Sequence, residues 1–392
     1  MRIIEIPEAQ VPRTEILPVQ KILNNGERHV SRQRENTTGK IKKMKNVAID
    51  LRFIDCYTGF GDICRNYARR IAAADTPGIH FILMVPKKHF GEFGGSVTYI
   101  SSETPEEDIR ERGLEIDLWH STDQLYEYFY KSPATKHLLT IHDLNFLYEK
   151  KHIHRWKHVW KFRNRVKDAD YISFISHFVE NDVDRTYGLA GKPHRVIYNG
   201  IRPVGVSDGV RPGFVEDEDE RFFLAISQIR RKKNFHTLVP MMRYFPEHKL
   251  YICGDDEFDY AGEIRRLIDK LGLDRVKLTG RVSDDEKTWL YRHCEAFLFP
   301  SRAEGFGIPV IEAMQQGCKV FSSRLTSLPE ICGPYATYWD NFEPEHMARV
   351  VMEGLSGDDG MTGKRKAYAS SFNYDRYTAD YLQLYSEILC GS

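Results

Sequence analysis

Short apolar runs recur along the chain and alternate with segments whose apolar residues have helical spacing. Buried strands are predicted at residues 46–53, 80–86, 117–121, 137–143, 171–176, 194–200, 221–227, 249–254, 275–280, 296–301 and 318–321, and the segment 331–339 continues the series. Helices are predicted at residues 63–73, 261–271, 284–293, 309–316 and 374–390, with a loop at 54–62. This alternation is typical of doubly wound parallel sheets and predicts the α/β class.

The alternation is interrupted at residues 204–220, which contain glycine and proline and then become strongly acidic, as linkers do. Because 392 residues are many for one core, two domains are expected. The predicted parts are an N-terminal extension (1–45), a first domain (46–203), the linker (204–220), a second domain (221–373) and a C-terminal helix (374–392) that packs back toward the first domain. Ligands of such sheets bind beyond the carboxyl ends of the strands.

Composition and charge exclude several classes of protein. Hydrophobic residues make up 41% of the chain and charged residues 29%, as in ordinary soluble globular proteins. The 56 basic and 56 acidic residues cancel, so no nucleic-acid partner is expected. The seven cysteines include no C-x-x-C pair, which favours reduced thiols and a cytoplasmic protein. No apolar run approaches the roughly 20 residues that span a bilayer, and the N-terminus is not typical of a signal peptide.

Residues 301–320 carry the most informative local pattern. Glu304 and Glu312 flank a glycine-rich turn, and Pro309 and Gly317 stand where a helix would begin and end. Glycines let backbone N–H groups approach a ligand, and a helix N-terminus favours an anion. Two carboxylates beside an anion site indicate a ligand with phosphate and hydroxyl groups, such as a nucleotide sugar.

A second candidate site is the segment SQIRRKKN, residues 227–234, directly after a predicted strand. Its cations are Arg230, Arg231, Lys232 and Lys233. Basic groups just past a strand end suit a diphosphate, although a solvated charged loop would have the same composition.

With these motifs in this order, the chain resembles the retaining GT-B glycosyltransferases of family 4. The resemblance covers about residues 47–390 and rests on TGFGD (58–62), TIHDLNFLY (140–148), SFISHFVENDV (173–183), RVIYNGI (195–201), RRKKN (230–234), LYICGDDE (250–257), LTGRVSDDE (278–286) and the E-x(7)-E loop at 304–312. It implies two Rossmann-like domains that face each other across a cleft. It also implies transfer of a hexose from a nucleotide sugar with retained configuration, without a metal or another cofactor.

The resemblance also assigns roles to matching residues. Lys233 matches the lysine that contacts the diphosphate, Glu304 the glutamate that faces the donor sugar, and His142 a histidine near the transferred sugar; these three form the expected catalytic set. Further donor contacts are expected from Gly59, Gly61, Gln228, Arg230, Arg231, Arg281, Val282, Phe306, Gly307, Ile308 and Glu312. Among these, Glu312 would bind the ribose, the backbone of 281–282 the nucleobase, and the amides of 306–308 the sugar and phosphate. Gln228 replaces an arginine of many members, so Arg230, Arg231 or Lys232 would have to supply part of the charge.

Several other functions compete with this interpretation. DDEFD (255–259) could be a D-x-D metal motif, and TGFGD lacks the third glycine of a dinucleotide fingerprint. Paired carboxylates also perform glycoside hydrolysis, but a loop and a helix start suit hydroxyl binding better. A GT-B sugar-nucleotide epimerase and a non-catalytic carbohydrate-binding relative remain alternatives. His177, at a strand–helix junction, suits capping or packing as well as substrate contact.

The segment AIDLRFIDCYTGFG (48–61) resembles GDP-mannose-dependent members, so GDP-mannose is the favoured donor, with UDP-glucose or another UDP-sugar as the alternative. The implied acceptor is a growing surface glycan or a lipid-linked oligosaccharide.

Residues 148–167 are strongly basic and include Ile153, Trp156 and Trp160 on one helical face. Such a helix could rest on an anionic membrane at the inner face of the cell, as a peripheral contact, or bind a phosphorylated acceptor. It could equally bury both tryptophans in the first domain and expose a solvated basic face.

Overall fold

The computed structural model describes residues 43–391, except 58, 129, 131, 150–151, 190, 204–207 and 358, and does not describe the side chains of 148–149 and 152–155. Nearly all of the predicted extension, and residues 204–207 of the predicted linker, lie outside the described residues. In the described part of the chain, no helix combines the length and apolarity needed to cross a bilayer.

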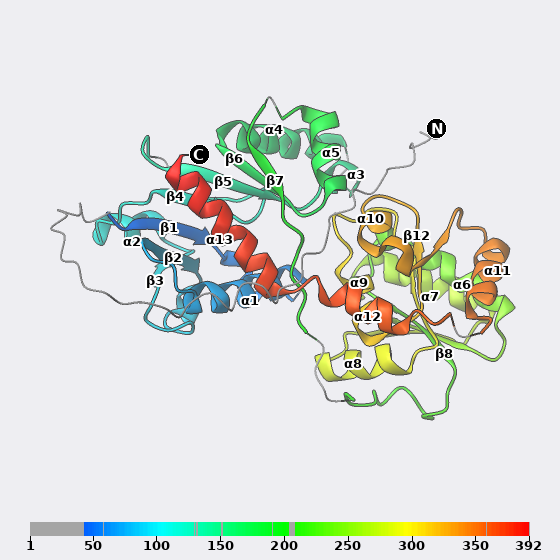
Figure 1. Cartoon of the computed structure of the whole chain (residues 1–392). Helices are drawn as coiled ribbons and strands as arrows, with labels where there is room; N and C mark the ends of the chain where they lie inside the picture. The colour runs from blue at the N-terminus through cyan, green and yellow to red at the C-terminus, as the bar shows by residue number, and fades with distance from the viewer. Residues whose placement is uncertain are drawn as a thin grey trace. The chain divides into compact units, whose positions relative to one another are not determined.

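The first half is built on a seven-stranded sheet in which every strand pair is parallel. Its strands are β1 (Lys45–Asp50), β2 (Ile79–Val85), β3 (Thr98–Ser101), β4 (Leu118–Ser121), β5 (Lys136–Ile141), β6 (Tyr171–Phe174) and β7 (His194–Val196), in the order β3-β2-β1-β4-β5-β6-β7. Its helices are α1 (Gly59–Ala73), α2 (Pro105–Glu111), α3 (Phe146–Glu149), α4 (His152–Asp168) and α5 (His177–Tyr187) (Figure 1).

The second half has a six-stranded sheet, again parallel in every pair. Its strands are β8 (Phe222–Ile226), β9 (Lys249–Cys253), β10 (Val276–Gly280), β11 (Ala296–Phe299), β12 (Val320–Ser323) and β13 (Thr337–Trp339), in the order β10-β9-β8-β11-β12-β13. Its helices are α6 (Leu238–Met241), α7 (Asp259–Leu271), α8 (Asp284–His293), α9 (Ile308–Gln316), α10 (Leu328–Cys332), α11 (Pro344–Leu355) and α12 (Thr362–Ser370).

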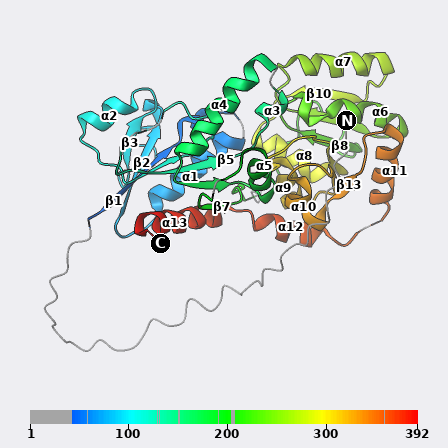
Figure 2. The same ribbon diagram turned by 90° about the horizontal axis from the view of Figure 1, so that it is seen from above.

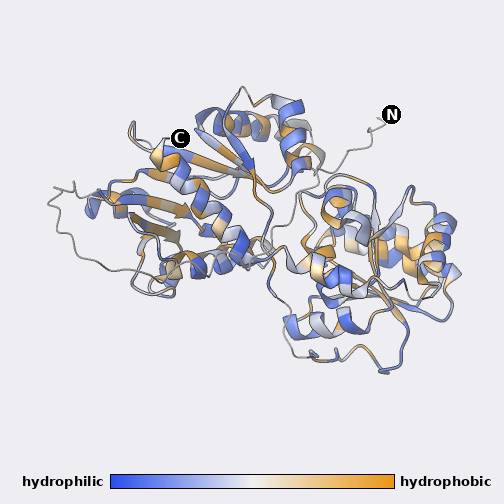
Figure 3. Ribbon diagram, in the orientation of Figure 1, coloured by the Kyte–Doolittle hydropathy of each residue, from blue (hydrophilic) through white to orange (hydrophobic). Residues whose placement is uncertain are grey.

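The strands are apolar on both faces because helices cover both sides of each parallel sheet. All four residues of β11 and all five of β8 are buried, for example. Figure 3 shows this as hydrophobic colour along the strands, while the helices carry hydrophilic faces. The predicted architecture of two Rossmann-like halves is confirmed.

The last helix, α13 (Tyr374–Cys390), returns to the first half and packs beside α1 (Figures 1 and 2). One stripe of α13 enters the same apolar core as β1, β2 and α1, and it consists of Tyr374, Tyr377, Tyr381, Leu384, Tyr385 and Ile388. Where the chain crosses back, the N–H of Ile201 donates to the carbonyl of Phe372 at 2.9 Å.

A buried polar network fixes α13 to the first sheet. The Tyr385 hydroxyl lies 2.6 Å from the Tyr67 hydroxyl and 2.6 Å from Nδ1 of His120. Nε2 of His120 lies 2.7 Å from the Thr140 hydroxyl, which is 3.0 Å from the Tyr381 hydroxyl. Burial lowers the pKa of His120 to about 3, and the nearby His142 acts in the same direction. His120 is therefore a neutral ring that links hydroxyls of α13 and β5.

Local bounds differ from the predictions at several places, of which three bear on the first half. The first strand ends at Asp50, because the Asp50 carboxylate accepts the N–H of Arg52 at 3.1 Å and a 3-10 turn follows at Arg52–Asp55. The predicted loop at 54–62 is shorter than expected, since α1 already begins at Gly59. Strand β3 was not predicted, because its four residues follow a segment rich in glycine and serine.

Candidate functional site

Lys233 and Glu304 follow the two strands at which the order of the second sheet reverses. Lys233 belongs to the loop after β8, and Glu304 to the loop after β11. In the sheet, β8 and β11 are neighbours. From β8 the chain continues to β9 and β10 on one side, and from β11 it continues to β12 and β13 on the other. Loops separate at such a switch point and leave room for a ligand beyond the carboxyl ends of the strands.

The structure brings these two side chains into direct contact. Nζ of Lys233 donates to Oε1 of Glu304 at 2.6 Å, and the residues are only 7% and 9% exposed. Burial lowers the pKa of Lys233, while the charge of Glu304 opposes this shift. The pair is therefore an ion pair removed from water, in which each charge depends on the other.

Unusual backbone conformations adjoin both members of the pair. In the described part of the chain, Asn234 and Thr326 are the only non-glycine residues with positive φ, at 62° and 55°. Asn234 follows Lys233, and Oγ1 of Thr326 accepts the N–H of Glu304 at 3.0 Å. Asparagine tolerates this region, but a β-branched threonine is strained there. Such strain tends to occur at functional sites.

Helix α9 begins directly after the loop that holds Glu304, residues 300–307, called the Glu304 loop below. Gly307 precedes it with φ of 102°, Pro309 lies in its first turn, and Gly317 ends it with φ of 90°. Gly59 of α1 lies against this end, since a Cβ at Gly59 would stand 2.6 Å from Cδ1 of Ile308. The structure thus brings Gly59, Gly307 and Ile308 together. Phe306, in contrast, is buried at 3% exposure.

Glu312, on α9, is held by two groups of α8. Its Oε1 accepts from Nζ of Lys287 at 3.0 Å, and its Oε2 accepts from the Tyr291 hydroxyl at 3.2 Å. Burial disfavours the charge of Lys287, but Glu312 and Asp284 outweigh it and raise the Lys287 pKa. Sequence reasoning missed Lys287 and Tyr291, because nothing in their local pattern marks them as partners of Glu312.

The other expected donor residues of the second half are more dispersed. The Arg230 guanidinium lies 4.4 Å from the centre of the Phe258 ring. Arg231 is paired with Glu263 of α7 and lies over the Tyr260 ring, so its charge is directed to α7. Gln228 contributes its carbonyl, which accepts the N–H of Arg230 at 2.8 Å.

Arg281 and Val282 lie beside an exposed aromatic residue of the first half. The Tyr57 hydroxyl donates to the Val282 carbonyl at 3.1 Å, and the Arg281 guanidinium lies 4.9 Å from the centre of the Tyr57 ring. Asp255 accepts from Arg281 at 2.9 Å. Gly61, in contrast, packs on backbone, because a Cβ there would stand 2.0 Å from the Cys56 carbonyl oxygen.

His142 follows β5, and its backbone meets the Glu304 loop. Nε2 of His142 donates to the Thr122 carbonyl at 2.7 Å, and its ring contacts that of Phe60 at 4.7 Å between centres. A Cβ at Gly305 would stand 1.9 Å from the His142 carbonyl oxygen. Only a glycine therefore allows the loop to approach His142 this closely.

The acidic segment 255–259 is engaged by arginines. Asp255 binds Arg281, as described, and Asp256 binds Arg265. Among the described residues, no group of three or more His, Cys, Asp or Glu is arranged to hold a metal ion.

Comparison with known proteins finds a family model for each half of the chain. The model for glycosyl transferases group 1 matches residues 208–369, and the model for glycosyltransferase family 4 matches residues 63–204. Together they cover most of both sheets, so each half of the chain matches a glycosyltransferase family model.

Relatives with described activities are similar over part of their length. The serotype-specific mannosyltransferase WbdA of Escherichia coli is 31% identical over 157 residues, which are 38% of this chain and 19% of that protein. The O-antigen chain mannosyltransferase RfbU of Salmonella typhimurium is 28% identical over 241 residues, which are 60% of this chain and 65% of that protein. The chain thus spans less than two thirds of either relative.

Solved structures support the fold. Sucrose-phosphate synthase from Thermosynechococcus elongatus has a TM-score of 0.68 at 18% identity and covers 89% of this chain and 100% of its own. HepE of Anabaena, solved with UDP and glucose, has a TM-score of 0.66 at 18% identity and covers 88% of this chain and 99% of its own.

Proposed function

We propose that the protein transfers a hexose, with mannose favoured, from a nucleotide-diphosphate sugar to a glycan or lipid-linked acceptor. The observation that carries this proposal is the buried Lys233–Glu304 pair at the switch point of the second sheet, beside the start of α9. A cation and helix amides suit a diphosphate, and a carboxylate suits sugar hydroxyls. The names of WbdA and RfbU support mannose as the sugar.

In this proposal the leaving diphosphate is stabilised without a metal ion. Lys233 and the first amides of α9 would offset the negative charge that develops as the glycosidic bond breaks. The donor phosphate would take the place of Glu304 as the partner of Lys233, which frees Glu304 for the sugar. Glu312 would likewise exchange Lys287 or Tyr291 for the ribose hydroxyls. Configuration would be retained by reaction on one face, with the leaving phosphate helping to deprotonate the acceptor.

The donor can be identified by thermal shift. A ligand that binds only the folded protein raises its melting temperature. At a ligand concentration of 100 times the Kd, the free energy of unfolding rises by about 2.7 kcal/mol. In a panel of GDP, UDP, ADP and their sugars, we expect GDP and GDP-mannose to give the largest shift. A larger shift with UDP and UDP-glucose would replace the favoured donor, and no shift with any of them would contradict the proposal.

The epimerase and binding-protein alternatives are separated by incubation of donor without acceptor. An epimerase would change the sugar while it remains on the nucleotide, whereas a transferase would at most hydrolyse it slowly. A binding protein would leave the donor intact even with acceptor present.

We further propose that α4 rests on an anionic membrane at the cytoplasmic face. Trp156 and Trp160 are 61% and 65% exposed, while α4 buries Phe162 and Val166 instead. Of the two alternatives for this helix, burial of both tryptophans is therefore excluded, and Ile153 lies outside the described side chains. Tryptophan favours the boundary between water and lipid, where its ring is apolar and its N–H is solvated.

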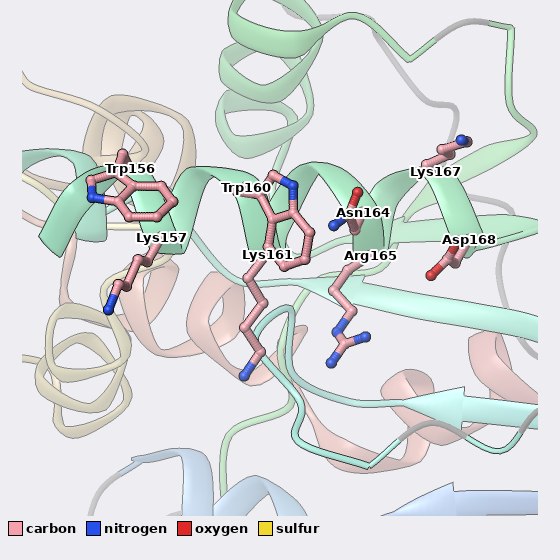
Figure 4. A pocket seen from close by; sticks show the side chains of 8 residues that line it. All are labelled: Trp156, Lys157, Trp160, Lys161, Asn164, Arg165, Lys167 and Asp168. Atoms are coloured by element: carbon pink, nitrogen blue, oxygen red, sulfur yellow. The ribbon is translucent and has the colours of Figure 1, made fainter.

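The charges of α4 complement an anionic surface. The basic residues of the helix are Arg155, Lys157, Lys161, Arg163, Arg165 and Lys167, against the single acidic Asp168. Figure 4 shows Lys157, Lys161 and Arg165 extending to one side of the helix, next to the face that carries both tryptophans. In a chain with no net charge, this concentration favours a lipid surface over a neutral partner.

Vesicle flotation tests this surface. We expect the protein to bind vesicles that contain phosphatidylglycerol and not pure phosphatidylcholine. Lys157→Glu with Lys161→Glu should weaken binding at least about tenfold, since each basic residue near an anionic surface contributes about 1 kcal/mol. Trp156→Ala with Trp160→Ala should also weaken it. Lys364→Glu and Tyr244→Ala, at exposed sites of the second half, are the matched controls. Binding that survives the charge reversal would contradict the proposal.

A further inference from the structure

Glu330 of α10 binds the N-terminus of a helix in the other half of the chain. Its Oε1 accepts from the N–H of His177 at 2.8 Å and from the Tyr198 hydroxyl at 2.9 Å, and its Oε2 accepts from the N–H of Phe178 at 2.8 Å. The first amides of a helix have no partner within it, and they favour an anion. Glu330 therefore supplies a carboxylate where α5 needs one.

Helix α5 has a cap of its own, so the role of Glu330 is an additional one. Oγ of Ser176 accepts the N–H of Val179 at 3.2 Å, as an N-cap does. The same hydroxyl donates to the Gly305 carbonyl at 2.7 Å. Ser176 and Glu330 thus both connect the N-terminus of α5 with the segments around the Glu304 loop.

The residues just before Glu330 hold the backbone of that loop. Oγ1 of Thr326 accepts the N–H of Glu304, and Oγ of Ser327 donates to the carbonyls of Glu304 at 3.0 Å and Phe306 at 3.2 Å. Thr326 does so with a φ of 55°, a costly conformation for a β-branched residue. The segment 326–330 therefore contacts the Glu304 loop at one end and α5 at the other.

We propose that Glu330 is a positioning residue: it holds α5 and the Glu304 loop in one arrangement, and so aligns Glu304 with the acceptor half during transfer. This inference rests on the proposed function. Glu330 reaches the reacting groups indirectly, through Thr326, Ser327, Ser176 and the Tyr198 ring, which lies 6.1 Å from that of Phe306, so its loss should lower turnover rather than donor affinity. A misplacement of about 1 Å can cost on the order of a hundredfold in rate.

The test compares Glu330→Ala and Glu330→Gln in the full chain with Glu345→Gln, an exposed carboxylate on α11, as the control. We expect Glu330→Ala to lower kcat at least about tenfold with the donor KM within about twofold, and to speed amide hydrogen exchange at 177–178. Glu330→Gln should recover part of kcat, because its amide oxygen still accepts one N–H. The control should match the parent protein.

An unchanged kcat in folded Glu330→Ala would overturn the inference and leave Glu330 a helix cap. A raised donor KM at unchanged kcat would overturn it in favour of a donor contact. If the parent protein turns over no nucleotide sugar, the proposed function fails. Hydrogen exchange then still decides the contact, and unchanged exchange at 177–178 overturns it. Should Glu330→Ala not fold, Glu330→Gln and Ser176→Ala are measured in the same way.

Discussion

Lys233→Ala is expected to lower hexosyl transfer by about 10²–10³-fold, the usual loss when one electrostatic contact to a developing charge is removed. Glu304→Ala should lower transfer at least about tenfold, because the sugar loses its carboxylate partner. Initial rates at saturating donor and acceptor measure both effects. Near-normal turnover in either variant would show that the site is elsewhere.

The same variants separate catalysis from stability. Each single variant leaves one charge buried without its partner, which costs about 3–5 kcal/mol of unfolding free energy. The double variant Lys233→Ala with Glu304→Ala removes both charges, so its melting temperature should lie above that of either single variant. Its rate should nevertheless stay low and show non-additivity. Lys270→Ala, at an exposed position of α7, is the control for loss of a lysine.

Mild acid is expected to destabilise the protein through His120. The folded state lowers the pKa of His120 to about 3, whereas an unfolded histidine has a pKa near 6.5. Between these values the unfolded chain binds a proton that the folded chain does not, so acid favours unfolding. The contribution of neutral His120 to the free energy of unfolding is complete above about pH 6.5. It falls by about 1.4 kcal/mol per pH unit below that value.

Urea unfolding between pH 7 and pH 4.5 measures this slope. His120→Gln should be less stable at pH 7, because the ring bridges Tyr385 and Thr140, but its stability should fall less steeply with acid. His177→Gln is the control, since the His177 side chain is 60% exposed. Parallel slopes for the parent protein and His120→Gln would contradict the assignment.

Most of the fold could be predicted from the sequence, because parallel strands buried on both faces appear as continuous apolar runs. Strands such as β8, β9 and β11 were predicted within one or two residues for this reason. The failures have local causes. The Asp50 carboxylate ends β1 by accepting the backbone N–H of Arg52. Gly59 already adopts helical geometry because α1 packs against the 3-10 turn at Arg52–Asp55 and against α13.

The candidate site was only partly predictable. The spacing of Glu304 and Glu312 and the cations at 230–233 are visible in the sequence, and the resemblance singled out Lys233 and His142. The partners of these residues are not visible, because they come from distant segments. Ser327 and Glu330 have the spacing of a capping box, which acts within one helix. Here Ser327 binds the Glu304 loop and Glu330 binds α5, so tertiary contacts replace the local ones.

Helix α13 has a consequence for anyone who recombines this chain with a relative to exchange its two halves. Its tyrosine stripe completes the core of the first half, although it follows the second half in the chain. A fragment that stops at the linker would expose Tyr67 and the buried His120, which contact α13, to solvent. The unit of exchange is therefore discontinuous: a transplanted first half must bring its own last seventeen-residue helix, attached downstream of the recipient's second half.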